Sequence, residues 1–377
     1  MARTGDPVVP VGPNDIQLAA HLFHPPRLTL ARELRGMTRV ELAAKVGKTP
    51  AAIGQFEGGG KAACRPDAKT LGLLALALSV PVGFFTRKTP AKSLDIDACH
   101  FRSLRSASQR ERRRLIARGS LLCDVLRVLE EHVELPAERV SAAAQGVDSE
   151  QDIEVCAAAV RRAWGLGLGP IANVVELLEA HGVIVTHIPD TCAAVDAFST
   201  WQEGRPIVFL VMEKGSTSRS RFDAMHELGH LIMHADAVPG SPVLESQANR
   251  FASAFLLPRE SFLAECPTWL NWDHFYELKR RWRVSVAALI RRARDLGRIS
   301  DASYRRAYVH LNRTGERQHE RDEPPYEPPT LISSALDAVA DDISASEVAA
   351  LVGVHATELE ALGARGSVSD DAQEHPS

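Results

Sequence analysis

Two histidines and a glutamate in the middle of the chain have the spacing of a metal-binding helix. His226, Glu227 and His230 form the pattern H-E-x-x-H, and the apolar residues between them are typical of a buried helix. Residues four apart in a helix project from nearly the same face, so both imidazoles can bind one ion, while Glu227 stands about 100° round from His226. The pattern therefore predicts a metal site with a general base beside it.

Two histidines do not complete such a site, because a catalytic zinc ion takes three protein ligands and an exchangeable water. Glu245 and Asn249 lie in a second helical pattern and share a face, since they are four residues apart. Either can bind the metal while the other hydrogen-bonds a ligating histidine. Asp236 is a less favoured third ligand, because Met233 stands where that arrangement turns the chain at a glycine.

The chemistry expected of such a site is hydrolysis of a peptide bond. A zinc ion there activates a water molecule and polarises the carbonyl, and Glu227 is expected to accept the proton and pass it to the leaving amine. His234 continues the same helix, and we expect it to be an exposed histidine at the helix end. The donor that stabilises the oxyanion is not identified by the sequence, and His234 and Arg221 are the nearby candidates.

These motifs resemble a known family. The run HELGH followed by ExxANxFAxxxLxP is similar to the ImmA/IrrE family of zinc metallopeptidases, over about residues 153–258. The resemblance implies zinc as the cofactor, and a protein substrate that is a helix-turn-helix repressor, cut to switch on genes for DNA damage or mobile elements. It implies these roles: zinc ligands His226, His230 and Glu245, general base Glu227, and Asn249 as a hydrogen-bonding partner of a ligand.

Composition restricts the class of protein. With 377 residues and 45% apolar content the chain can form two or three packed domains. The opening residues predict neither a signal peptide nor a membrane span, so no membrane partner is expected. Six cysteines without a C-x-x-C pair are typical of reduced thiols in the cytoplasm. Residues 26–120 are basic and 316–377 acidic, which places nucleic-acid binding in the N-terminal part.

The basic N-terminal part contains a helix-turn-helix pattern within residues 27–87. Thr38 and Glu41 form a capping box, Gly47 permits a sharp turn, and Thr49 caps a following helix. A second helix held in this way can lie in the major groove of DNA. The expected DNA contacts are Thr49, Ala52 and Gln55 on its outward face, with Arg39 and Lys48 near phosphates.

This pattern resembles the Xre-type repressor domain, T-x-x-x-L-A followed by G-x-[ST]-x-x-x-I-S-x-x-E-x-G. The matching residues are Thr38, Leu42, Ala43, Gly47, Thr49, Ile53 and Glu57. Gly54 replaces the usual serine, which costs a helix interior up to about 1 kcal/mol. The resemblance implies DNA as a partner.

The remaining chain predicts helices around a small sheet. A helix from 99 to 133 carries a cluster of arginines and an apolar stripe, which makes it our candidate for homodimerisation. From residue 151 the pattern becomes mixed, with helices at 153–164 and 171–180. Strands are expected at 183–188, 195–200 and 206–212, and such strands can form the wall on which an extended substrate pairs.

The predicted fold is multidomain and mainly α. It comprises an N-terminal all-α helix-turn-helix domain, a central α+β zincin-like metallopeptidase domain with a small sheet, and a C-terminal helical region. The expected segments are a flexible N-terminus (1–25), the helix-turn-helix domain (26–90), a basic helical region (91–148), the peptidase domain (149–262), a helical extension (263–315), and an acidic linker with a small helical segment and tail (316–377).

Three functional interpretations follow from these parts. The favoured one is a cytoplasmic DNA-binding regulator with zinc-dependent endopeptidase activity, which cuts a repressor-type protein or itself. The second is an Xre-type transcription factor whose peptidase-like domain is a non-proteolytic sensor, although a purely structural site would not need Glu227. The third is a toxin-antitoxin or prophage regulator built from the same two parts.

Overall fold

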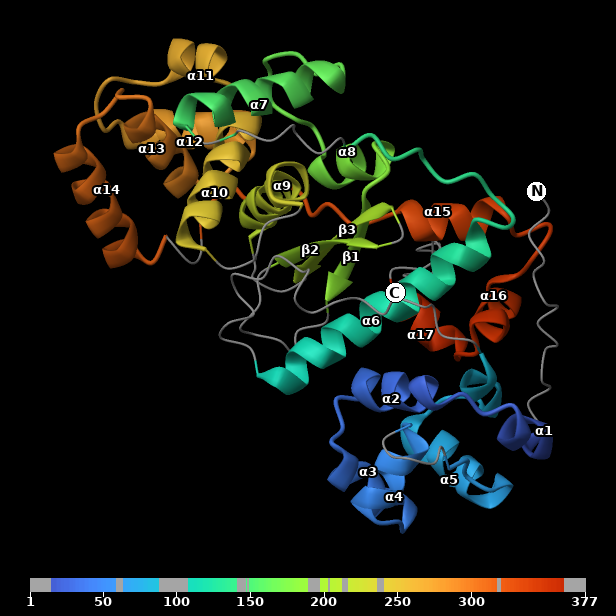
Figure 1. Ribbon diagram of the computed structural model, residues 1–377. Helices are drawn as coiled ribbons and strands as arrows, with labels where there is room; N and C mark the ends of the chain where they lie inside the picture. Colours follow the sequence, from blue (N-terminus) through green and yellow to red (C-terminus); the bar gives the residue numbers. More distant parts are fainter. Residues whose placement is uncertain are drawn as a thin grey trace, which may run out of the picture. The chain divides into compact units, whose positions relative to one another are not determined.

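The computed structural model describes residues 15–58, 64–87, 108–140, 147, 149–188, 197–202, 204–211, 216–235, 241–316 and 320–362. These residues fall into two compact units. The first contains the described residues up to 135 and those from 330 onward, and the second contains those from 136 to 329. Both are mainly helical, and among the described residues only the second has strands (Figure 1). The predicted fold class, mainly α and multidomain with a small central sheet, is confirmed.

The first unit begins with a bundle of short helices around a helix-turn-helix. Thr38 and Glu41 form the predicted capping box, Gly47 turns the chain at φ 64°, and the Thr49 hydroxyl accepts from the Ala52 amide. These helices are α1 (Ile16–His21), α2 (Pro25–Leu34), α3 (Arg39–Val46), α4 (Pro50–Phe56), α5 (Ala68–Leu78) and the 3-10 turn η1 (Val82–Thr86).

A long helix and three C-terminal helices complete the first unit. They are α6 (Gln109–Leu129), α15 (Leu331–Ala338), α16 (Ala345–Val352) and α17 (Ala356–Ala361). Residues 99–107 of the predicted basic helix lie outside the described residues. The apolar face of α6, which we expected to meet a second copy, is covered within the chain by α2, α15 and α16.

A single buried arginine connects these parts of the first unit. Arg27 on α2 is fully buried and donates to the Phe84 carbonyl at 3.1 Å, to the Asp124 carboxylate at 2.5 Å and to the Val352 carbonyl at 3.4 Å. Because a buried guanidinium needs such partners, residues from η1, α6 and α16 are brought to one point.

The second unit is a three-stranded sheet surrounded by helices. The strands β1 (Ile184–Ile188), β2 (Ala197–Gln202) and β3 (Arg205–Val211) lie in the order β1-β3-β2, with β1 parallel and β2 antiparallel to β3. The helices are α7 (Glu150–Ala163), α8 (Val174–Ala180), α9 (Thr217–Met233), α10 (Pro242–Leu256), α11 (Arg259–Glu265), α12 (Trp272–Trp282), α13 (Val286–Asp295) and α14 (Asp301–Thr314).

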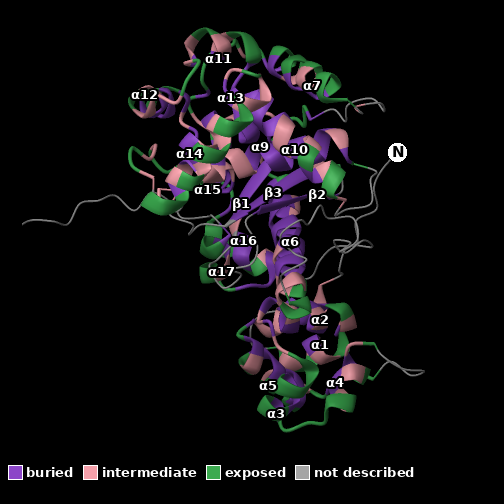
Figure 2. Cartoon of the chain, turned by 90° about the vertical axis from the view of Figure 1, so that its left-hand side faces the viewer, coloured by how far each residue is buried: buried purple, intermediate pink, exposed green. Residues whose placement is uncertain are grey.

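The core of this unit includes the space between the sheet, α9 and α10, and it extends to α12, α13 and α14. Helix α9 packs on β2 and β3 on one side and on α10 on the other, and α10 also packs on α7. Most residues of the strands and of α9 are buried, as the purple parts of Figure 2 show. The helix that carries the H-E-x-x-H pattern is therefore the central element of its unit.

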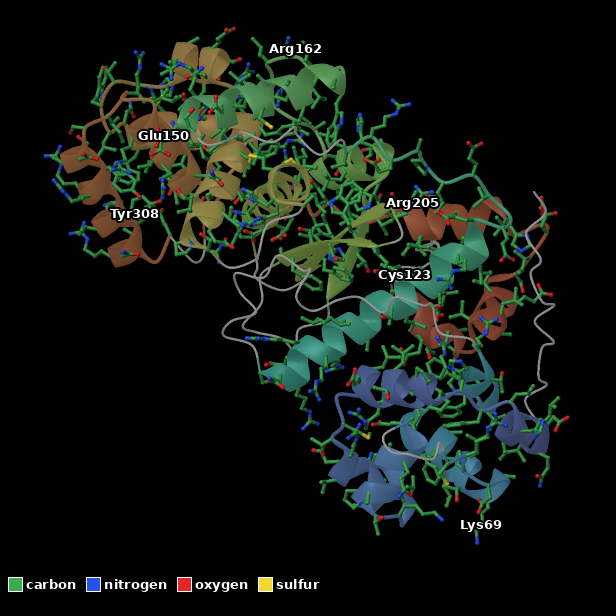
Figure 3. The ribbon with its side chains drawn as sticks, in the orientation of Figure 1. Lys69, Cys123, Glu150, Arg162, Arg205 and Tyr308 are labelled. Carbon is green, nitrogen blue, oxygen red and sulfur yellow. The ribbon has the colours of Figure 1, made fainter. Side chains whose placement is uncertain are left out.

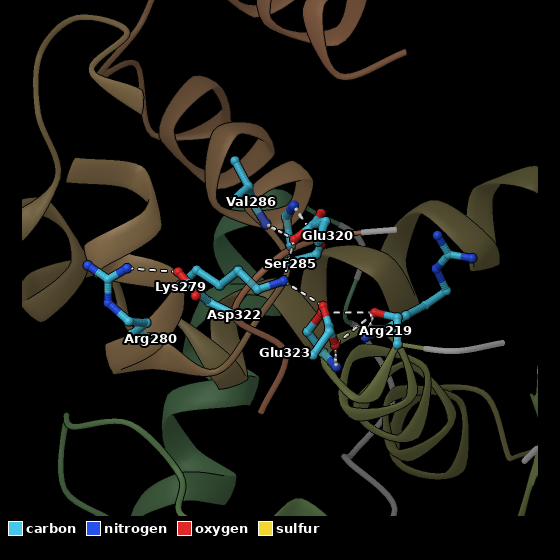
Figure 4. Close-up of polar contacts among 11 residues, drawn as sticks. Arg219, Lys279, Arg280, Ser285, Val286, Glu320, Asp322 and Glu323 are labelled. Atoms are coloured by element: carbon cyan, nitrogen blue, oxygen red, sulfur yellow. Dashed lines mark hydrogen bonds and ion pairs between the residues drawn. The ribbon is translucent and has the colours of Figure 1, made fainter. Parts of the chain in front are cut away.

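Residues 320–327, which we name the acidic strap, anchor two helices of the second unit through glutamates. Glu320 accepts from the Val286 amide at the start of α13 (2.9 Å), and Glu323 accepts from the Ser218 amide at the start of α9 (2.9 Å). Both carboxylates also bind the buried Lys279 ammonium, at 2.6 and 2.5 Å (Figure 4). The carboxylates thus satisfy helix N-termini and neutralise a buried cation.

A third glutamate of the acidic strap repeats this arrangement at α8. Glu327 accepts from the Val174 amide at 2.8 Å and forms an ion pair with the buried Arg221 guanidinium. The sequence predicts a linker over 316–329, but residues 320–327 are held to the second unit at three helix N-termini.

We expect Lys279→Met to destabilise the second unit by about 3–5 kcal/mol, because the largely buried Glu320 carboxylate and the partly buried Glu323 carboxylate would lose their cation. The matched control is Arg280→Met, which removes an exposed ion pair with Asp322 and should cost less than about 1 kcal/mol. All five tryptophans lie between residues 164 and 282, so tryptophan fluorescence during urea unfolding reports on this unit. Equal destabilisation by both variants would contradict the role given to Lys279.

Candidate metal centre

The H-E-x-x-H pattern lies in the C-terminal half of α9. The Ser216 hydroxyl caps this helix by accepting from the Arg219 amide, and apolar side chains hold the helix between the sheet and α10. His226 and His230 are buried, with 9% and 2% of their surface exposed. The Nε2 atoms of the two imidazoles lie 3.1 Å apart, as the spacing of four residues predicts.

Helix α10 brings a carboxylate to these two imidazoles. It begins after Ser241, whose side chain caps it. Glu245, in its first turn, has Oε2 at 3.3 Å from His226 Nε2 and Oε1 at 3.7 Å from His230 Nε2. Among the described residues this is the one group of three or more His, Cys, Asp or Glu side chains whose ligand atoms converge, all within 4.8 Å of one another.

The close approach of α9 and α10 depends on a glycine. Gly229 lies between Glu227 and His230 in the sequence, and it faces Phe251 of α10. A Cβ atom at residue 229 would lie 3.1 Å from Phe251 Cδ1 and 3.3 Å from its Cβ, which is closer than side chains normally pack. The absence of a side chain at Gly229 therefore allows Glu245 to reach the imidazoles.

The three side chains fit a divalent metal ion such as zinc. Ligand atoms about 2.0–2.2 Å from a tetrahedral zinc ion lie about 3.3–3.6 Å from one another, and the separations found here are 3.1, 3.3 and 3.7 Å. Two imidazoles and one carboxylate are also a donor set that zinc accepts in catalytic sites. Such a set leaves a fourth position for water or substrate.

The electrostatics of the centre also favour a cation. Burial raises the pKa of Glu245, but hydrogen bonds and charges from His226 and His230 outweigh it and lower the pKa to about 2. Burial lowers the pKa of His230 to about 4, so this imidazole is neutral at pH 7. Burial also opposes charge on His226, but the carboxylates of Glu245 and Glu227 raise its pKa. A metal ion would take the place of the proton that His226 attracts.

Asn249 orients the first histidine. Its Oδ1 lies 3.2 Å from His226 Nδ1, and its Nδ2 donates to the Glu245 carbonyl at 2.8 Å. Because the amide nitrogen is used by that carbonyl, Oδ1 accepts from Nδ1 and leaves the Nε2 lone pair of His226 toward the centre. The structure thus places Asn249 beside a histidine and Glu245 beside both imidazoles, which is one of the two arrangements that the sequence allows.

The second histidine is oriented by residues that sequence reasoning missed. His230 Nδ1 lies 2.9 Å from His234 Nδ1, His234 Nε2 lies 2.9 Å from Gln247 Oε1, and the Gln247 amide donates to the Val147 carbonyl at 3.1 Å. Our expectation that His234 is exposed is wrong, because Gln247 of α10 lies against it and only 4% of its surface is exposed. The spacing of four residues from His230 was the available signal.

Glu227 points away from α10 toward strand β2. Its Oε2 accepts from the Ser199 hydroxyl at 2.6 Å, and burial raises its pKa to about 7. The strand is held against α9 a second time, because Trp201 Nε1 donates to the Leu231 carbonyl at 3.2 Å. Glu227 is therefore a buried carboxyl group that can exchange a proton near neutral pH.

The side chains considered as oxyanion donors have other partners. Arg221 donates to Glu327 of the acidic strap and to the Ile171 carbonyl at 2.6 Å, and His234 is engaged with His230 and Gln247, so neither is placed as an oxyanion donor. Asp236 lies outside the described residues.

The expected DNA contacts lie on the surface of the helix-turn-helix. Lys48 and Gln55 are exposed, and Ala52 is half-buried. The Thr49 hydroxyl is used as the cap of α4, and Arg39 forms an ion pair with Glu57 at 2.6 Å while half of its side chain stays exposed. Lys48 and Gln55 are thus the most accessible of the five for DNA.

We expect Gly229→Ala to weaken metal binding and to destabilise the second unit by about 1–3 kcal/mol, because the added methyl group would push Phe251 and α10 away. Competition with a chromogenic chelator measures the metal affinity, and tryptophan fluorescence measures unfolding. Gly167→Ala is the control, since no atom lies within 4 Å of its added Cβ. Unchanged affinity in Gly229→Ala would contradict the packing argument.

We expect Asn249→Ala and His234→Ala each to lower metal affinity by about 10–100-fold, because each would release one ligating imidazole. The same chelator competition measures both effects. Val243→Ala on the exposed side of α10 should leave affinity unchanged. If either variant binds metal as tightly as the original chain, the orienting role of that residue is refuted.

Comparison with known proteins agrees with both regions. Residues 178–294 match the family described as the IrrE N-terminal-like domain, peptidase M78, and residues 28–85 match the helix-turn-helix family. The peptidase match runs beyond residue 262, where the sequence-based domain prediction ends, and the boundaries stay a prediction. No curated protein matches the chain. Among the described residues no helix is both long and apolar enough to span a bilayer. The chain therefore carries an N-terminal helix-turn-helix and, after it, an IrrE-like domain of the metallopeptidase type.

Proposed function

We propose that this chain is a DNA-binding transcriptional regulator with zinc-dependent endopeptidase activity. Its substrate would be a repressor-type protein of the helix-turn-helix class, cut in trans, or the chain itself. Cleavage would control gene expression under stress or on induction of a mobile element. The observation that carries the proposal is the buried Glu227, which directly follows the ligand candidate His226 and lies beside the convergent set of His226, His230 and Glu245.

His226, His230 and Glu245 would hold the zinc ion. When bound, zinc supplies a Lewis acid that activates water and polarises a peptide carbonyl. The side chains of Asn249 and His234 keep the two imidazoles in the orientation that points Nε2 at the centre. The proposed zinc ligands and the side chains that orient the imidazoles lie on α9 and α10 or at the end of α9. The geometry of the site therefore depends on the packing of these two helices.

Glu227 would act as the general base and then as the general acid. Its pKa of about 7, raised by burial, allows its carboxylate to accept a proton from water and return it to the leaving amine. The Ser199 hydroxyl donates to Oε2 and restricts the position of this carboxylate. A sensor without proteolysis would have no use for a buried, oriented acid at this position, which favours the enzyme over that alternative.

Strand β2 is the candidate wall for an extended substrate. It is an edge strand of the described sheet, and it contacts α9 at Ser199 and Trp201. A peptide that pairs with such an edge lies with its backbone alongside the base. A substrate-bound structure without pairing at β2 would refute this part of the proposal.

The helix-turn-helix would bring the peptidase to DNA, or to a repressor at its operator, in the cytoplasm. Proteins of this class commonly bind as dimers, and a homodimer stays a prediction. The apolar face of α6 is not evidence for a homodimer, because helices of the same chain cover that face.

We expect Glu227→Gln to retain zinc and lose cleavage, because the amide keeps the size of the side chain but cannot accept a proton. Bound zinc is measured by atomic absorption. Cleavage is measured by incubating the chain with Xre-type repressors, and by incubating it alone to detect cleavage of the chain itself. Glu260→Gln, an exposed change on α11, is the control. Cleavage by Glu227→Gln at the original rate would refute the assignment of the base.

We expect Lys48→Ala to weaken DNA binding across sequences and to reduce the slope of log K against log salt by about 1, because one phosphate contact would be lost. Fluorescence anisotropy at several salt concentrations measures this slope. Arg162→Ala is the control, since Arg162 is an exposed cation on α7 of the second unit (Figure 3). Equal slopes for Lys48→Ala and the original chain would exclude Lys48 as a phosphate contact.

A further inference from the structure

The second unit contains a pocket of about 680 Å³ that the proposed reaction does not use. It lies between α7, α9, α10, α13 and α14, and Glu150 and Tyr308, labelled in Figure 3, mark its walls on α7 and α14. This volume is in the range of small-molecule sites, which are about 300–1,000 Å³. Apolar side chains contribute part of the wall, including Phe222, Val243 and Ala288.

The charged groups that line this pocket are mainly cationic. Four guanidinium groups face it, against two carboxylates, Glu150 and Asp295. The arginines come from three helices: Arg219 from α9, Arg250 from α10, and Arg291 and Arg294 from α13. Guanidinium groups from several elements around an apolar wall are suited to an organic anion, because each can donate two parallel hydrogen bonds to a carboxylate or phosphate.

Two of the ion pairs at this pocket have an exposed partner, while Arg294 also pairs with Asp301 at 2.7 Å and Arg250 lies 3.8 Å from Glu154. Arg250 pairs with Glu150 at 3.0 Å, but the Glu150 side chain is 77% exposed. Arg291 pairs with Asp295 at 3.3 Å and is itself 49% exposed. Exposed pairs of this kind contribute little stability. Ser253 also lines the pocket, and its buried hydroxyl has no hydrogen-bond partner among the described residues.

The pocket shares two side chains with the metal centre. Asn249 and Gln247 form part of its wall, and they are the residues that hydrogen-bond His226 and His234. A ligand that displaces either amide would change the orientation of an imidazole that we assign to the metal. Coupling of this kind acts in both directions, so metal binding would also change the affinity for the ligand.

We propose that this pocket is a regulatory site for a small organic anion, with a carboxylate or phosphate on an apolar body, and that its occupancy alters metal affinity at the neighbouring centre. The site goes beyond the proposed proteolysis, and its binding can be measured on a chain that cuts nothing.

The first experiment measures binding to the full chain by calorimetry at constant ionic strength. Phenyl phosphate and 3-phenylpropionate share an apolar body and differ in the anionic group, so they distinguish phosphate from carboxylate. Benzyl alcohol is the neutral probe. We expect one anion to bind and benzyl alcohol to bind at least about tenfold more weakly, as loss of a charged hydrogen bond predicts. Absence of binding by both anions, or equal binding of benzyl alcohol, would overturn the proposal.

Matched variants locate the site. Arg219→Gln with Arg291→Gln should weaken binding of the anion at least about tenfold. Arg305→Gln with Arg306→Gln removes the same charge from α14 outside the pocket lining and should change binding less than about twofold. Tryptophan fluorescence checks that both double variants fold. Equal weakening by the two would show a general charge effect and overturn the site.

The second experiment tests the coupling. Zinc affinity is measured by chelator competition with and without a saturating concentration of the anion that binds. We expect the anion to change the zinc affinity by at least about fivefold, which is the lower range of measured couplings. This effect should be lost in the double variant Arg219→Gln with Arg291→Gln. If zinc affinity is unchanged and the probe instead competes with a cleaved protein substrate, the pocket receives an acidic side chain of that substrate, and the regulatory proposal is wrong.

Discussion

The close contact between α9 and α10 is the constraint on which the metal centre depends. Gly229 faces Phe251 at a distance where no other side chain would fit without displacement. Only because the two helices approach so closely does Glu245 reach within 3.3 and 3.7 Å of the Nε2 atoms of two histidines. The same interface brings Asn249 to His226 Nδ1 and Gln247 to His234, which itself contacts His230 Nδ1. One packing contact therefore positions both the ligands and their partners.

The other elements of the second unit hold α9 in place on its remaining sides. Strand β2 contacts Glu227 through Ser199, so the sheet positions the proposed base, while α10 brings Glu245 to the candidate metal centre. The acidic strap fixes the first turn of α9 by hydrogen bonds from Ser218 to Glu323. Because Glu323 also neutralises the buried Lys279, the start of α9 is tied to α12. Each neighbour thus contacts a different part of α9: α10 packs against the histidine face, β2 contacts Glu227, and the acidic strap contacts the N-terminus.

The sequence predicts those features that depend on local spacing. Two imidazoles four residues apart, the pair Glu245 and Asn249 on the following helix, and the capping box of the helix-turn-helix all follow from helical geometry and occur in the structure. It fails where a residue's partner is distant in sequence. The spacing of His234 from His230 indicates that the two can meet, but the burial of His234 depends on Gln247 of another helix. The acidic strap has the composition of a linker. Its glutamates meet their partners only in the folded unit, and one of them, Glu323, accepts from Ser218, more than 100 residues away.

We infer that one metal ion binds His226, His230 and Glu245 together. X-ray diffraction from crystals of the full chain grown with zinc, recorded above and below the zinc absorption edge, tests it most directly. We expect an anomalous peak within about 2.0–2.2 Å of both Nε2 atoms and of a Glu245 oxygen, with Asn249 still hydrogen-bonded to His226. A peak bound to other side chains, or none at these three residues in zinc-saturated crystals, would contradict it.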